Sequence, residues 1–239
     1  MPAAVLPVPA RVAALVLAWA TSACAAPQVA PADAPALSAA PSGPQREEID
    51  VALAVYEAGS LQEAERRFRA LARKGSPVGR YNLAMMHVLG EAQRPDADEA
   101  VRLLEQSAAQ GFIRSEYALG QVYELGVAGP PDQPRAVAWY QRAARHGHID
   151  AQVSLGTAYY LGRGIGKDAA QAAQWYRAAA QAGDVGAQYL LASMYESGLG
   201  VEQDLRIARY WYEAAARNGD EAAPHKVREL DQRLREVPL

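Results

Sequence analysis

The chain has 239 residues, of which 50% are hydrophobic and 21% are charged, and its formal net charge is −3. This mild negative charge argues against a nucleic acid or an anionic membrane surface as the partner. The single cysteine, Cys24, excludes an intramolecular disulfide. The length fits one or two ordinary domains or one elongated array.

Residues 1–24 have the features of an export signal peptide. Arg11 precedes a short apolar run at 12–20, and small residues follow as far as Cys24. The run is shorter than the roughly 20 residues that a membrane-spanning helix needs. Thr-Ser-Ala-Cys at 21–24 resembles the bacterial lipobox, in which the cysteine becomes the lipidated first residue of the mature protein. We therefore expect lipid attachment at Cys24, and the alternative is ordinary cleavage after Ala25.

The resemblance to a lipoprotein signal carries an expectation about location. Ala25 follows the cysteine where inner-membrane lipoproteins have aspartate. By analogy with lipoprotein sorting, we expect an exported, periplasmic chain that is anchored to the outer membrane. The lipid would then be the only contact with the membrane.

Residues 25–45 are rich in alanine, serine and proline. This composition cannot build a core and favours extended conformations of about 3.1 Å per residue. We interpret the segment as a disordered tether that holds the rest of the chain away from the membrane.

A period of 36 residues runs through most of the remaining chain. It places glycine at five evenly spaced positions, Gly75, Gly111, Gly147, Gly183 and Gly219. Leucines, aspartates, alanines and Trp-Tyr pairs repeat with the same step, and such a period indicates a repeat array. The predicted repeats are 77–112, 113–148, 149–184 and 185–220.

The repeat at 149–184 shows the expected local structure. Residues 151–161 read as a first helix, and residues 169–182 read as a second helix. Asp168 is suited to the N-cap of the second helix, because its carboxylate accepts bonds from free backbone amides. Gly183 is suited to the left-handed conformation that ends a helix.

Helical spacing separates a buried face from an open one in each repeat. Leu155, Ala158 and Tyr159 share one side of the first helix, and Ala172 and Tyr176 share one side of the second. A single helix pair cannot cover these faces, whereas stacked pairs can. The sequence therefore predicts an all-α fold, an α-solenoid of stacked antiparallel helix pairs.

The segments on either side of the repeats are also expected to be helical. Residues 46–76 look like a degenerate repeat in which about five turn residues are missing. Residues 221–239 carry many charges, and a polar terminal helix is what a repeat array needs as its cap.

The repeats resemble a known family. Leu155, Gly156 and Tyr159, then Gly162, Gly164 and Asp168, and then 172–183 follow the pattern of the Sel-one-like repeat (SLR), a relative of the tetratricopeptide repeat. The first repeat departs most, with His87, Leu103 and Leu104 in the aromatic positions. The resemblance implies a right-handed solenoid and a non-catalytic protein that binds other proteins.

The sequence predicts no catalytic site and no metal site, and no cofactor is expected. The glycines at 162–166 belong to the repeat pattern, because Asp168 stands where a phosphate-binding loop needs serine or threonine. Common hydrolase motifs are absent. His146 and His148 read as surface residues, and His87 reads as a half-buried packing residue.

The candidate binding face is the side of the first helices that the core does not use. By the resemblance it lines the concave surface, where tyrosines among polar residues suit recognition of a protein or peptide. The candidates are Tyr81, Met85, Tyr117, Gln121, Glu124, Thr157, Tyr160, Tyr189, Ser193 and Glu196, with Val88 and Val153 at matching positions.

The sequence therefore favours a scaffold or adaptor of the bacterial cell envelope whose protein or peptide partner it does not identify. Two alternatives remain: a periplasmic hydrolase of cell wall or β-lactam, and a module that binds glycan or peptidoglycan.

Overall fold

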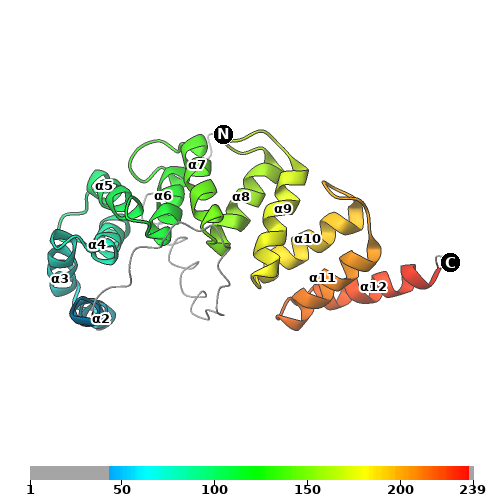
Figure 1. Cartoon of the computed structure of the whole chain (residues 1–239), viewed down its shortest axis with the longest axis horizontal. Coiled ribbons are helices and arrows are strands. Elements are labelled where there is room, and N and C mark those ends of the chain that lie inside the picture. The colour runs from blue at the N-terminus through cyan, green and yellow to red at the C-terminus, as the bar shows by residue number, and fades with distance from the viewer. Residues whose placement is uncertain (1–42, 237–239) are drawn as a thin grey trace, which may run out of the picture. The chain divides into compact units, whose positions relative to one another are not determined.

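The computed structural model describes residues 43–236, and the secondary-structure elements in this part of the chain are all α-helices joined by turns (Figure 1). The predictions for the signal peptide, for Cys24 and for most of the tether lie outside the described residues. The helices are α2 Gly43–Glu57, α3 Leu61–Arg73, α4 Pro77–Leu89, α5 Ala97–Ala108, α6 Ile113–Leu125, α7 Gln133–Arg145, α8 Ile149–Leu161, α9 Ala169–Gln181, α10 Val185–Ser197, α11 Leu205–Arg217 and α12 Ala223–Glu236.

The helices form antiparallel pairs that stack in chain order, as the all-α solenoid prediction requires. Extensive contacts join consecutive helices, for example α4 with α5, α8 with α9, and α10 with α11. The described chain divides into two bodies, 43–139 and 140–236, with the boundary inside α7. We call them the N-terminal body and the C-terminal body.

Helix boundaries agree closely with the expected ones. In the repeat at 149–184 the first helix begins two residues earlier than predicted, at Ile149, and the second spans Ala169–Gln181. At the N-terminal end, α2 begins at Gly43, so the last three residues assigned to the tether are helical. Only three residues separate α2 from α3, whereas seven separate α8 from α9, which explains why residues 46–76 look like a shortened repeat.

The helices begin and end where the 36-residue period predicts, because of the residues at their ends. The five glycines at the 36-residue step all have positive φ, from +81° to +100°. At Gly183, with φ +98°, the backbone N–H donates to Ala180 and the next N–H donates to Ala179, which satisfies the last carbonyls of α9. A side chain at this backbone conformation would be strained.

The four periodic aspartates all cap a second helix. Asp96, Asp132, Asp168 and Asp204 accept backbone N–H groups from residues two or three positions later, at 2.8–3.0 Å. Three of them also donate their own N–H to the carbonyl of the tyrosine nine residues earlier. In the first repeat His87 replaces that tyrosine and is 7% exposed, and its Nδ1 accepts the Asp96 N–H at 3.1 Å. His87 is thus buried and hydrogen-bonded, not half-buried as predicted.

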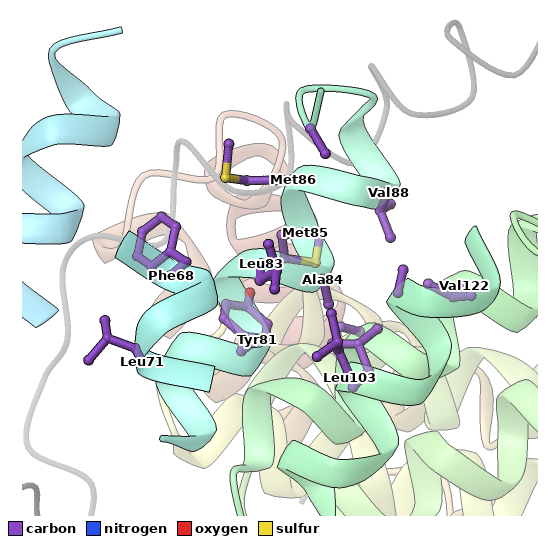
Figure 2. Packing of buried hydrophobic residues seen from close by; sticks show 14 of the residues in the cluster. Phe68, Leu71, Tyr81, Leu83, Ala84, Met85, Met86, Val88, Leu103 and Val122 are labelled. Atoms are coloured by element: carbon purple, nitrogen blue, oxygen red, sulfur yellow. The ribbon is translucent and has the colours of Figure 1, made fainter. Parts of the chain in front are cut away.

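Each body has its own hydrophobic core. In the N-terminal body the core includes Phe68, Leu71, Leu83 and Leu103 (Figure 2). In the C-terminal body Leu191 packs with the alanines and Tyr176 of α9. A second cluster joins Tyr212 to Leu230 of α12, so that α12 covers the end of the last repeat.

Candidate binding surface

The first-helix face is not open along α4. Tyr81 and Met85 are each 6% exposed and Val88 is 5% exposed, so the prediction that they lie outside the core is wrong. Figure 2 shows all three among the packed side chains of the N-terminal core. The ring of Tyr81 meets the ring of Phe112 edge-on, with 5.3 Å between the ring centroids. Burial raises the pKa of Tyr81, and its ring contributes to packing.

One feature of the sequence indicates that Tyr81 of α4 is buried. Phe112 occupies the position where the later repeats have His148, Asp184 and Asp220. An aromatic residue at this position, which is the N-cap of α6, gives Tyr81 a ring to pack against at the end of its own repeat.

On α6 the candidates are only partly accessible. Gln121 is 9% exposed, which contradicts its assignment to an open face, while Tyr117 and Glu124 are half-buried. The Oε1 atom of Gln121 is buried without a hydrogen-bond partner in the described part of the chain. An orphaned acceptor of this kind carries a free-energy cost of about 1–3 kcal/mol unless a water molecule or a ligand group reaches it.

The corresponding face of the C-terminal body is more open. Tyr160 on α8 is 38% exposed, and Thr157, Tyr189 and Ser193 are half-buried. Tyr189 packs edge-on against Tyr212, with 4.9 Å between the ring centroids. The first-helix face therefore presents one accessible tyrosine ring on α8, together with partly accessible residues on α8 and on α10.

Two tyrosines of the Trp-Tyr pairs, Tyr176 and Tyr212, form hydrogen bonds to hydroxyl residues of this face, Thr157 and Ser193, although the sequence pattern assigns them to the core alone. The Thr157 hydroxyl donates to the Val153 carbonyl at 2.9 Å and lies 3.0 Å from the Tyr176 hydroxyl. Burial raises the pKa of Tyr176, and the bond to Thr157 opposes that shift. The recurrence of a hydroxyl residue, Thr157 and then Ser193, was the available sequence signal for these contacts.

Glu196 is committed to contacts within the chain. Its carboxylate accepts from the Tyr212 hydroxyl at 2.9 Å, from Lys226 at 3.3 Å and from Arg233 at 3.0 Å. The pKa of Tyr212 is raised by burial and further by its bond to this carboxylate. Partial burial by itself lowers the pKa of Lys226. The hydrogen bonds to Glu229 and Glu196 have the larger effect, so the pKa is raised. Glu196 therefore ties α12 to α10 and α11, a role that the sequence did not reveal.

The described residues contain no cluster of three or more histidine, cysteine, aspartate or glutamate side chains that could hold a metal ion. Between residues 43 and 236, no helix combines the length and the apolarity that crossing a membrane requires.

Comparison with known proteins identifies the repeat. A family model described as the Sel1 repeat matches residues 77–112, 113–148, 149–184 and 185–220. These four matches cover more than half of the chain. Sel1 repeat proteins are typically protein-interaction scaffolds and are generally non-catalytic. No curated protein matches the chain.

Two solved structures are similar in both sequence and fold. A Sel1 repeat protein from Oxalobacter formigenes is 33% identical, with a TM-score of 0.66, over 71% of this chain and 50% of that one. A protective antigen of uropathogenic Escherichia coli with an SLR fold is 30% identical, with a TM-score of 0.73, over 80% of this chain and 42% of that one. The chain thus spans about half the length of these relatives. With four matched repeats folded as stacked helix pairs, the chain belongs to the Sel1 repeat family.

Proposed function

We propose that the chain is a non-catalytic scaffold of the bacterial cell envelope that binds a protein or peptide through the first-helix face of its C-terminal body. The observation that carries this proposal is the accessible ring of Tyr160 on the same face of α8 as the half-buried hydroxyl residue Thr157. Tyrosine is enriched among the residues that dominate binding energies, because it combines a large apolar area with a polar tip. The typical role of Sel1 repeat proteins as interaction scaffolds supports the same function.

The binding proposal is tested by capturing a partner from an envelope fraction and titrating it against variants. Tyr160→Ala should weaken the affinity by at least about tenfold, as expected for a residue that anchors an interface. Tyr210→Ala is the matched control, since Tyr210 is 56% exposed but lies on the second helix α11. Equal affinity of wild type and Tyr160→Ala, or equal loss in both variants, would contradict the proposed face.

The envelope part of the proposal is supported by the sequence at 11–25. A lipidated chain should begin at Cys24 once mature and should incorporate labelled fatty acid. Cys24→Ser should abolish both the labelling and the association with membranes. A mature chain that begins at Ala26 would instead identify ordinary cleavage after Ala25 and would remove the lipid anchor from the proposal.

A further inference from the structure

A pocket lies at the turn that connects α6 to α7, within the N-terminal body. Its volume is about 450 Å³, which is within the range of roughly 300–1,000 Å³ that is usual for ligand pockets. Its apolar wall is formed by Val122, Tyr123, Ala128, Pro130, Pro131 and Pro134. Asp132 and Arg135 also line the pocket, and their side chains are 36% and 68% exposed, which places them at its rim.

The pocket coincides with a departure from the repeat. At the middle of the same turn the later repeats carry Ile165 and Val201, and Val201 packs against the core of its own body. The equivalent residue here is Gly129, whose φ of +149° disfavours any side chain. The turn between α6 and α7 therefore has no β-branched side chain at this position.

Hydrogen bonds hold the frame of the pocket in place. The Asp132 N–H donates to the Tyr123 carbonyl at 2.8 Å, and the Val127 N–H donates to the Val122 carbonyl at 3.0 Å. The Gln133 side chain donates to the carbonyl of Glu124 at 3.3 Å, which ties the start of α7 to the end of α6. Proline rings further restrict the backbone. A site framed in this way loses little conformational entropy when a ligand binds.

The chemistry of the walls favours an aromatic group. The Arg135 guanidinium lies 5.6 Å from the centre of the Tyr123 ring and pairs with Asp132 at 3.2 Å, so the rim charges are balanced. A neutral rim does not select a charged ligand. A ring that enters beside Tyr123 gains edge-to-face contact with it and a cation–π contact with Arg135, neither of which an aliphatic group can make.

We propose that this pocket binds an aromatic side chain, tryptophan or phenylalanine, of a partner peptide. The pocket belongs to the N-terminal body and the proposed first-helix face to the C-terminal body, so they share no residue and the pocket would give the protein a second point of attachment. Binding here does not depend on Tyr160, so the two proposals can fail independently.

The test uses N-acetyl-tryptophanamide as the ligand and follows the backbone amide signals of the full chain by NMR. Saturable shifts are expected at residues 122–135, and N-acetyl-leucinamide should bind at least several-fold more weakly. Pro130→Glu places a charge in the apolar wall and should weaken binding by at least about tenfold. The last repeat carries Glu202 at the equivalent position, so this change is compatible with the fold.

Gly166→Glu is the matched control, because it introduces the same charge at the equivalent position of the repeat at 149–184. It should leave the affinity unchanged. The proposal is overturned if the amides of 122–135 do not shift saturably, or if Pro130→Glu binds as well as Gly166→Glu. Equal or tighter binding of N-acetyl-leucinamide overturns the preference for an aromatic ring.

Discussion

Individual side chains differ sharply in how much they contribute to this fold, even between neighbours on one helix. Leu191 is fully buried, with 0% exposed, whereas Leu190 is 40% exposed. Leu191→Ala should lower the free energy of unfolding by about 2–5 kcal/mol, because it removes a buried side chain and leaves a cavity. Leu190→Ala is the control and should change it by less than about 0.5 kcal/mol. Urea denaturation followed by circular dichroism measures both, and similar losses would contradict the burial.

The close approach of α8 and α9 at Gly156 allows a second test of a single residue. A Cβ atom at Gly156 would lie 2.9 Å from the ring of Tyr176. Gly156→Ala should therefore destabilise the fold by about 1–3 kcal/mol through overpacking. Gly186→Ala is the control, since this helical position has room for a Cβ, and it should be neutral or stabilising. Thermal melts of the two variants should move in opposite directions or differ clearly in size.

At the scale of helices, polar side chains tie each repeat to the next. Gln188 donates to the Ala180 carbonyl at 3.1 Å and accepts from Asn218 at 3.0 Å. Gln152, one period earlier, donates to the Ala144 carbonyl at 3.2 Å, but its Oε1 is buried without a partner in the described chain. The residue that corresponds to Asn218 is alanine at 182, which has nothing to donate.

The missing hydrogen bond to Gln152 suggests a stabilising substitution. Ala182→Asn should restore the missing bond to Gln152 and raise the free energy of unfolding by about 0.5–1.5 kcal/mol. Asn218→Ala should lower it by a similar amount, because it orphans Gln188 in the same way. Denaturation of both variants checks the pair. If Ala182→Asn lowers the free energy of unfolding, and adding Gln152→Ala does not reverse that loss, the two positions do not interact.

The attachment of α12 should depend on pH. Asp231 pairs with Arg209 at 2.5 Å, and this bond holds the pKa of Asp231 below its usual value. A carboxyl group with a depressed folded pKa stabilises above its unfolded pKa of about 3.9 and loses that effect as the pH falls through the folded pKa. We expect α12 to lose hydrogen-exchange protection on acidification below about pH 4. Asp231→Asn should make α12 less protected at neutral pH and should flatten this dependence.

The whole molecule combines a folded array with an N-terminal segment that its composition predicts to be a tether. Deleting residues 25–42, which stops short of α2, should leave the melting temperature unchanged within about 2 °C, since a tether contributes no core. The control is deletion of α12, which should lower the melting temperature because Leu230 is buried in the last core cluster. A large loss from the first deletion would contradict the tether interpretation.

The sequence predicted the features that depend on local chemistry. The 36-residue step located the helix-ending glycines, and the aspartates located the N-caps, because both effects act within a few residues of the chain. The close approach at Gly156 was also predictable, since the position stays small through the repeats. The helical architecture thus followed from the repeat alone.

Only the tertiary structure decided which first-helix side chains remain accessible. Tyr81 and Met85 occupy the same helical face as Tyr160, yet both are buried in the N-terminal core, where the ring of Phe112 packs against Tyr81. Glu196 looked equally available and is held by α12. The exposure of a side chain depends on what the neighbouring repeats place against it, and a period read along one chain does not contain that information.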